Sequence, residues 1–289
     1  MKNKKSLFCF KDYNRRRFIQ NVANAGLTFV AASSVLNAEP AKAASGDYVV
    51  GCVKPLTKPP AGIPDETIVD LLKFLPAGIK ILPDYMNLTK GTKAEMQDSL
   101  SNYEKNTAYL AEQHCDLISI EGAPPFMVLG RQRETALIDG WEKKYKTPMF
   151  TSSQNQVNAF KAVKAKNIYG VTPFSGSINK SYADYFVEAG YNSVAIDGIS
   201  GIPFSEIQNV KSGRVYSFIK RNFLKHKGVD TIYILGSAWN TLDIIEPLEQ
   251  DLGVTVINPV AARAWEILKR FRIHQPVQGY GHLLATLPS

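Results

Sequence analysis

The sequence has few of the side chains that hold metals or form disulfides: its 289 residues include three cysteines and four histidines. Cys9 lies in a segment that we expect to be removed, which leaves Cys52 and Cys115 at the start and end of two predicted buried strands. No cysteine or histidine spacing is typical of a zinc site, so we expect none. A disulfide is permitted in an exported protein, but a sequence does not supply the geometry that one requires.

Glycine-rich phosphate loops are also missing. Residues 198–201 (GISG) have neither the length nor the Lys-Ser/Thr ending of a P-loop. Because no other cofactor motif is present, we expect no cofactor.

No apolar run has the length that predicts a membrane span. The best candidate, residues 22–36, is short and is interrupted by Asn, Gly, Ser and Thr. It follows a twin-arginine pattern at residues 14–20 (NRRRFIQ) and precedes a small-x-small cleavage signal at residues 41–43. We therefore predict that residues 1–44 are an export signal for the twin-arginine machinery, and that the mature protein is periplasmic or otherwise exported.

The mature chain has little excess of either charge. Residues 1–43 hold eight Lys/Arg and two Asp/Glu, so +6 of the whole-chain charge of +8 lies there and +2 remains. The basic isoelectric point therefore gives no reason to expect a nucleic acid as partner.

The rest of the chain alternates between predicted strands and helices. Short apolar or β-branched runs predict strands at residues 49–53, 79–82, 117–120, 168–171, 193–196, 231–235 and 255–257. Helical patterns lie between them, at residues 94–113, 177–189, 206–225, 242–251 and 261–270. Continuous apolar strands separated by helices predict an α/β fold with parallel sheets that helices cover on both faces.

Two stretches of the chain share one pattern. Residues 116–123 (DLISIEGA) and 230–237 (DTIYILGS) each run six residues from Asp to Gly and predict a buried strand that ends in a glycine turn. Such turns lie at the carboxyl ends of strands, where α/β proteins bind ligands. We therefore predict two related lobes facing a shared cleft, residues 45–150 and 151–261, with residues 262–289 returning to the first lobe.

Several motifs occur in a familiar order: Gly-x-x-x-Pro at residues 51–55, the turn at Gly122, residues 241–256 (TLDIIEPLEQDLGVTV), Trp265, and Gly-Tyr-Gly at residues 279–281. This order resembles arylmalonate decarboxylase and its maleate cis-trans isomerase relatives, in the aspartate/glutamate racemase superfamily. The resemblance covers essentially the whole mature chain. It implies two pseudo-symmetric flavodoxin-like lobes, each a parallel sheet flanked by helices, with a carboxylate substrate in the cleft between them.

The resemblance also implies catalytic cysteines, which this chain lacks. Racemases and isomerases of the superfamily carry one cysteine in each half, and the decarboxylase keeps the second as its proton donor. Gly122 and Gly236 stand at these positions. Because glycine supplies neither a proton nor a nucleophile, we do not expect two-thiol racemisation or covalent isomerisation of maleate.

The substrate-binding residues that the resemblance implies surround the two glycine turns. Ala123 and Pro124 replace hydroxyl side chains of the decarboxylase, and Phe174 replaces a tyrosine. At the second turn, the N–H groups of Ser237 and Ala238 and the Ser237 hydroxyl are retained at a predicted helix start, which favours an anion. We expect a more apolar cleft that keeps part of its anion site.

Further residues are candidates for the chemistry of the cleft. Glu121 is a candidate general acid, because burial would raise the pKa of its carboxyl; alternatively it caps the next helix or reaches solvent. Lys54, beside Pro55, pairs with a substrate carboxylate or is a surface lysine. Cys52 is expected on the same strand face as Lys54, or is a core residue. Trp239 either lines the cleft or packs in the core.

Two classes of function remain open. The first is an exported enzyme, a decarboxylase-like lyase acting on a small carboxylate or dicarboxylate, because decarboxylation needs charge stabilisation and one proton delivery, from water or Glu121. The second is a non-catalytic periplasmic carboxylate-binding protein on the same fold. Loss of both thiols favours the second class.

Overall fold

A computed structural model describes residues 48–236 and 239–287 of the chain. The predicted export signal at residues 1–44 lies outside these residues. Within them, eight strands form two four-stranded sheets in which every pairing is parallel. The strands are β1 (Tyr48–Lys54), β2 (Ile79–Tyr85), β3 (Leu117–Ile120), β4 (Met149–Thr151), β5 (Asn167–Thr172), β6 (Asn192–Gly198), β7 (Thr231–Ile234) and β8 (Thr255–Ile257).

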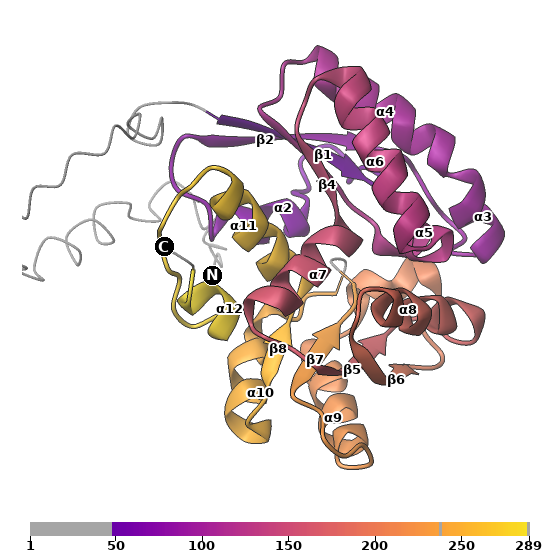
Figure 1. Ribbon diagram of the computed structural model, residues 1–289, viewed down its shortest axis with the longest axis vertical. Coiled ribbons are helices and arrows are strands. Elements are labelled where there is room, and N and C mark those ends of the chain that lie inside the picture. The colour runs from indigo at the N-terminus through magenta and orange to yellow at the C-terminus, as the bar shows by residue number, and fades with distance from the viewer. Residues whose placement is uncertain (1–47, 237–238, 288–289) are drawn as a thin grey trace, which may run out of the picture. The chain divides into compact units, whose positions relative to one another are not determined.

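The two sheets repeat one strand order, β2-β1-β3-β4 and β6-β5-β7-β8. β3 and β7, which come from the two stretches of shared sequence pattern, therefore occupy equivalent positions. Both are buried along their whole length, as continuous apolar strands are in a parallel sheet covered on two faces. The prediction of an α/β fold with two helix-flanked parallel sheets is confirmed (Figure 1).

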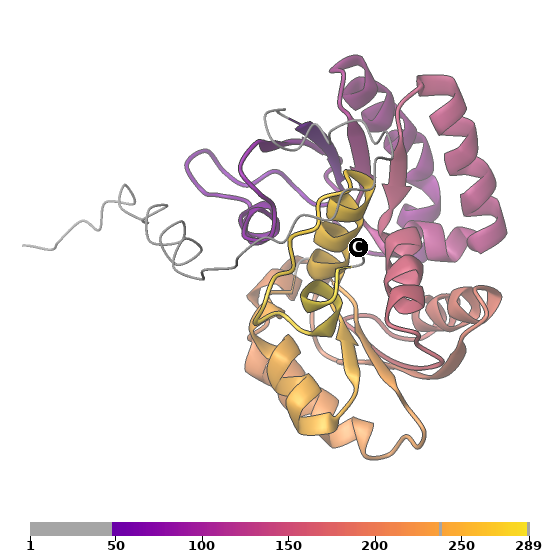
Figure 2. The same cartoon turned by 60° about the vertical axis from the view of Figure 1, so that its left-hand side comes forward.

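Helices connect successive strands and cover the sheets (Figures 1 and 2). They are α2 (Glu66–Leu72), α3 (Lys93–Asp98), α4 (Leu100–Glu112), α5 (Ala123–Leu129), α6 (Arg131–Tyr145), α7 (Ser152–Ala162), α8 (Ser177–Glu188), η3 (Phe204–Asn209), α9 (Ser212–Phe223), η4 (Leu242–Ile244), α10 (Ile245–Leu252), α11 (Pro259–Arg270) and α12 (His282–Ala285). No helix in the described part of the chain is long and apolar enough to cross a membrane.

Two predicted helices are interrupted in the structure. The one expected at residues 94–113 divides into α3 and α4 at Ser99, whose hydroxyl donates to the Met96 carbonyl over 2.7 Å. The one expected at residues 206–225 divides into η3 and α9, because Val210 and Lys211 have extended backbones. A serine hydroxyl that bonds to a nearby backbone carbonyl, as at Ser99, competes with the helical hydrogen bonds, so serine favours helix ends over helix interiors.

Strand β4 was not predicted. It is only three residues long and follows Pro148, so it is too short for an apolar run to identify it. Thr151 at its end also caps α7: its hydroxyl accepts the Gln154 N–H over 3.0 Å, and the Gln154 side chain accepts the Thr151 N–H over 3.1 Å. This capping box begins the connection from the first sheet to the second.

A buried carboxylate lies beside this connection. Glu134 of α6 accepts hydrogen bonds from the hydroxyls of Thr151, Ser153 and Tyr185, the last of these on α8. Its side chain is fully buried, and burial raises the pKa of the carboxyl above its usual value although the three hydroxyls oppose the change. Helices that flank different sheets therefore share one hydrogen-bonded cluster.

Helix α11 follows β8 of the second sheet but packs on both α7 and α2 (Figures 1 and 2). It begins at Pro259, two residues before the predicted start, because Asn258 caps it by accepting the N–H groups of Val260 over 2.8 Å and Ala261 over 3.3 Å. The lobe boundaries at residues 150 and 261 stay predictions.

Candidate functional site

A cavity of about 730 Å³ lies where the central strands of the two sheets end. Pro55, Gly122, Pro173 and Gly236 line it, and they follow β1, β3, β5 and β7 respectively. Open α/β sheets bind ligands beyond the carboxyl ends of their strands, where the strand order reverses. The β1–β3 and β5–β7 pairs are such points, so this cavity lies in the place where both sheets are suited to a ligand.

Most residues predicted for the site meet along this cavity. Trp239 does not: it is 1% exposed, its ring packs in the hydrophobic core, and its N–H donates to the Gly236 carbonyl over 3.0 Å. Ser237 and Ala238 lie outside the described residues. The predicted residues in the cavity wall are Lys54, Pro55, Glu121, Gly122, Ala123, Pro124, Phe174 and Gly236.

Lys54 is held by groups of the protein itself. The register that pairs Val53 of β1 with Ile120 of β3 brings the next residues, Lys54 and Glu121, together. Lys54 Nζ lies 2.9 Å from Glu121 Oε2 and 3.4 Å from Asp65 Oδ2, and it donates to the Thr67 hydroxyl. An ammonium has three donors, and these contacts occupy them.

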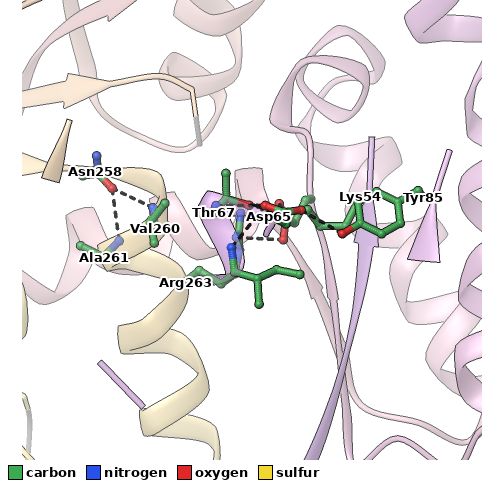
Figure 3. A network of polar contacts seen from close by, with 10 residues as sticks. Lys54, Asp65, Thr67, Tyr85, Asn258, Val260, Ala261 and Arg263 are labelled. Atoms are coloured by element: carbon green, nitrogen blue, oxygen red, sulfur yellow. Dashed lines mark hydrogen bonds and ion pairs between the residues drawn. The ribbon is translucent and has the colours of Figure 1, made fainter. Parts of the chain in front are cut away.

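Asp65 is the second anion beside Lys54, and sequence reasoning missed it (Figure 3). Its Oδ1 caps α2 by accepting the Thr67 N–H over 2.9 Å, and its Oδ2 accepts the Tyr85 hydroxyl over 3.0 Å. Burial acts to raise the pKa of this carboxyl, but the Lys54 charge and the hydrogen bonds from Thr67 and Tyr85 outweigh it and hold the pKa below its usual value. Asp65 is therefore a carboxylate at neutral pH.

Arg263, on the second turn of α11, completes the group of charges (Figure 3). Its Nη1 lies 2.9 Å from Glu121 Oε1, although neither atom makes a hydrogen bond within the described residues, and both side chains are 1% exposed. The contact is thus an ion pair without hydrogen-bond alignment. With Lys54 and Asp65, the four side chains form a balanced cluster of two cations and two anions, of which Asp65 is half-buried and the other three are buried.

The geometry around Glu121 bears on its predicted role as a general acid. Each of its two oxygens faces a cation at ion-pair distance, Oε2 facing Lys54 and Oε1 facing Arg263. Both oxygens are therefore already engaged by charged groups of the protein. The arrangement favours Glu121 as a structural counter-ion at the edge of the cavity.

Cys52 does not supply a thiol to the cavity. It is fully buried and is not among the residues that line the cavity. Burial, and next the neighbouring Glu121, raise the pKa of its thiol to about 12, so it is protonated at neutral pH and is no nucleophile. Cys52 and Cys115 are both free, so the disulfide that export would permit is not formed.

The two glycines that resemblance aligns with catalytic cysteines differ in their surroundings. Both have positive φ, +91° at Gly122 and +115° at Gly236. A Cβ atom at Gly122 would lie 2.4 Å from the Tyr103 hydroxyl, whereas at Gly236 the nearest atoms, those of Trp239, lie 3.6 Å away. The space for a side chain at residue 122 is therefore occupied by the Tyr103 hydroxyl, whereas the space at residue 236 has room for a small side chain.

Tyr103 and Gln156 are polar residues of the cavity wall that the sequence motifs did not identify. Both side chains are fully buried. The Tyr103 hydroxyl and the Gln156 Nε2 have no hydrogen-bond partner among residues 48–236 and 239–287, while Gln156 Oε1 accepts the Tyr233 hydroxyl over 2.7 Å. Because Tyr233 fixes the amide orientation, Gln156 keeps its N–H donors for another acceptor.

The rest of the cavity wall is mainly apolar. The rings of Phe174 and Phe204 stack with centroids 6.3 Å apart. At the rim, Gly91 approaches Phe204 so closely that a Cβ atom at residue 91 would lie 2.3 Å from the ring. Ile63, Met96, Ile207 and a series of prolines extend this apolar surface: Pro55, Pro59, Pro60, Pro64, Pro124, Pro125, Pro173 and Pro259.

Solved structures with a similar fold include three enzymes that are named for a dicarboxylate substrate. A cysteine-to-alanine variant of maleate isomerase Iso from Pseudomonas putida S16, solved with maleate, has a TM-score of 0.72 and 19% identity over 82% of this chain and 97% of its own. Maleate cis-trans isomerase from Nocardia farcinica has a TM-score of 0.73 and 18% identity over 83% and 98%. Arylmalonate decarboxylase has a TM-score of 0.69 and 20% identity over 82% and 98%. None of the curated proteins matches the chain significantly.

The two parallel sheets of one repeated strand order, with a cavity at their glycine turns, define an α/β protein with the fold of these enzymes. The family model for arylmalonate decarboxylase matches residues 62–284, most of the chain. The chain therefore belongs to the arylmalonate decarboxylase family.

Several residues of the site could not be found from motifs because they lie on separate elements. Asp65 lies in a loop, Tyr103 and Gln156 lie on helices, and Arg263 is 142 residues from its partner Glu121. One signal was present for Arg263: a charged residue stands in the otherwise apolar run Pro-Val-Ala-Ala-Arg-Ala-Trp. A charge on a buried helix face predicts a buried partner.

Proposed function

We propose that this protein binds a small carboxylate with an apolar substituent in the cavity between the two glycine turns, without thiol chemistry. One observation carries the proposal: the cavity combines an apolar wall with the Gln156 amide, a buried donor that lacks an acceptor among the described residues. A buried donor without a partner is unfavourable. A ligand oxygen would remove this cost.

The charge of the site supports a ligand held by neutral donors. Lys54 and Arg263 are already paired with Glu121 and Asp65, so the cluster has no excess positive charge for a bound carboxylate. An amide donor and the N–H groups of a glycine turn can bind one carboxylate without an added cation. The stacked rings of Phe174 and Phe204 suit an aromatic or other flat apolar substituent.

Calorimetric titration of the purified chain with phenylmalonate and maleate tests the proposal. We expect saturable binding, tighter for phenylmalonate because its ring adds apolar contact. Gln156→Met should weaken binding about tenfold or more, the usual effect of losing a hydrogen bond to a charged group. Gln156→Met also removes the hydrogen bond from the Tyr233 hydroxyl to Gln156, so Tyr233→Phe measures the effect of losing that bond alone. Asn155→Leu is the matched control, since Asn155 is equally buried and unpartnered but does not line the cavity. Equal binding by wild type and Gln156→Met would refute this role.

A second candidate is loss of CO₂ from the bound acid. The apolar wall favours it, because a carboxylate surrounded by apolar groups loses solvation that the departing CO₂, which is neutral, does not need. The electron pair left on the α-carbon then takes a proton from water. Proton NMR in D₂O distinguishes the two candidates: a decarboxylase converts phenylmalonate to a product deuterated at the α-carbon, whereas a binding protein returns the diacid unchanged.

We also propose that residues 1–44 direct export by the twin-arginine route, on the basis of the motif at residues 14–20 and the cleavage signal at residues 41–43. Replacement of Arg15 and Arg16 by Lys should retain the chain in the cytoplasm. Cell fractionation checks this, and export of the double variant at the wild-type level would contradict it.

A further inference from the structure

The space beside Gly122 holds a hydroxyl group. Tyr103, on α4, places this group where a side chain at residue 122 would begin, 2.4 Å from an ideal Cβ position. Pro55 Cγ is the next closest atom to that position, at 3.1 Å. Tyr103 and Gly122 both line the cavity. The hydroxyl therefore fills the side-chain position on the first-sheet side of the cavity.

The Tyr103 hydroxyl has no structural partner in the described chain. It is closed to water, and none of residues 48–236 and 239–287 forms a hydrogen bond with it. The ring itself is held by an edge-on contact with Phe126, with centroids 5.0 Å apart. Phenylalanine would make the same ring contact without burying a polar group, so packing does not explain the oxygen.

We infer that Tyr103 is a ligand-positioning residue whose hydroxyl, like the Gln156 amide, donates a hydrogen bond to the bound carboxylate. The inference rests on the proposed function, since it assigns a contact to the same ligand. Tyr103 is carried by α4 next to the first sheet and Gln156 by α7, which leads into the second. One neutral donor from each half then holds the ligand between the two glycine turns.

The phenol is suited to donate over a wide pH range. Burial, and next the nearby Glu121, raise the pKa of Tyr103 above its usual value, so its proton stays in place at and well above neutral pH. Because this donor is neutral, it also adds no charge to the balanced cluster beside it. The contribution of Tyr103 to binding should therefore be the same from pH 6 to pH 9.

The test compares Tyr103→Phe with Tyr182→Phe in the full chain, with phenylmalonate as probe. Tyr182 is the matched control: it is fully buried and its hydroxyl is unpartnered among the described residues, but it does not line the cavity. We expect Tyr103→Phe to weaken binding about 10- to 150-fold, the range for a hydrogen bond to a charged acceptor. Tyr182→Phe should bind like wild type.

Thermal unfolding separates ligand positioning from a structural role. Tyr103→Phe should be at least as stable as wild type, because its buried hydroxyl has no protein partner to lose. A large loss of stability would overturn the inference, and so would wild-type affinity in Tyr103→Phe or an equal loss in Tyr182→Phe. If wild type binds no carboxylate, both the proposed function and the role of Tyr103 are overturned. If wild type binds and Tyr103→Phe binds equally well, only the role of Tyr103 is overturned.

The steric part of the inference has an independent readout. In wild type, Gly122→Ala should be strongly destabilising, because the new Cβ atom meets the Tyr103 hydroxyl and the backbone has positive φ. In the Tyr103→Phe background the contact with the hydroxyl is gone, while the backbone strain and the 3.1 Å approach to Pro55 Cγ remain, so the same substitution should cost less. Equal destabilisation in both backgrounds would show that the hydroxyl does not occupy this position.

Discussion

The buried charge cluster makes a quantitative prediction about Glu121. Glu121→Gln keeps the shape of the side chain but removes one of two anions. Lys54 retains Asp65 at 3.4 Å, whereas Arg263, 1% exposed, loses the one ion pair that the described structure gives it. Breaking a buried pair in this way costs about 3–5 kcal/mol, since it leaves an uncompensated charge out of water. We expect that loss in the free energy of unfolding.

The double variant Glu121→Gln/Arg263→Met tests the reasoning more sharply than either single change. It removes the stranded cation together with its partner, and the Lys54–Asp65 pair that remains is balanced. Replacing both members of a buried pair is often close to neutral, so we expect the double variant to unfold within about 1 kcal/mol of wild type.

Urea unfolding followed by circular dichroism measures these differences, provided that the m-value is unchanged. Lys180 and Asp184 are the control, because their 2.7 Å ion pair is 74% and 56% exposed. Breaking such a surface pair should cost about 1 kcal/mol or less. A double variant of Glu121 and Arg263 that loses the sum of the two single effects would refute the charge-balance argument.

Three further predictions concern other buried groups. Because burial raises the pKa of Cys52 to about 12, iodoacetamide at pH 8 should modify it only after denaturation; rapid labelling of the folded protein, read by mass spectrometry, would contradict this. Burial raises the pKa of Glu134 in the fold, so its contribution to stability is fully present below the unfolded pKa of about 4.3 and is lost as pH rises through the folded value. Urea unfolding from pH 4 to pH 8 should show this fall in wild type but not in Glu134→Gln, and parallel curves would disprove it. Gly236→Cys should still fold, because the nearest atoms of Trp239 leave room at 3.6 Å, with a loss of stability of about 1–2 kcal/mol from its positive φ. If phenylmalonate slows alkylation of the new thiol, the thiol lies in the cavity; an unchanged alkylation rate would argue against that placement.

Much of the fold followed from local sequence pattern. β3 and β7 were recognisable because parallel strands buried on both faces are continuously apolar, and their glycine turns marked the edge of each sheet where the cavity lies. β4 could not be recognised, since three residues after a proline carry too little periodicity. At Ser99, where α3 gives way to α4, the hydroxyl donates to a backbone carbonyl, a contact that a helical pattern does not reveal.

The candidate site was predictable only where it coincides with the strand ends. Lys54 ends one central strand, and Glu121 and Gly122 follow the other, so their place in the chain indicated the cavity. Their partners depend on tertiary structure: Arg263 reaches Glu121 because α11 packs beside α2 and α7. Tyr103 was missed because one tyrosine on an amphipathic helix is usually a packing residue, and only its distance to Gly122 distinguishes it.

The position of α11 limits how this protein can be recombined with its relatives. The helix follows the last strand of the second sheet, yet its Arg263 balances Glu121 at the end of β3 in the first. A chimera joined at residue 150 would take Glu121 and Arg263 from different parents. If one parent lacked the matching charge, the remaining charged residue would be buried without a partner. The halves repeat one strand order, but they are not interchangeable modules, and a viable exchange must carry α11 together with the first sheet.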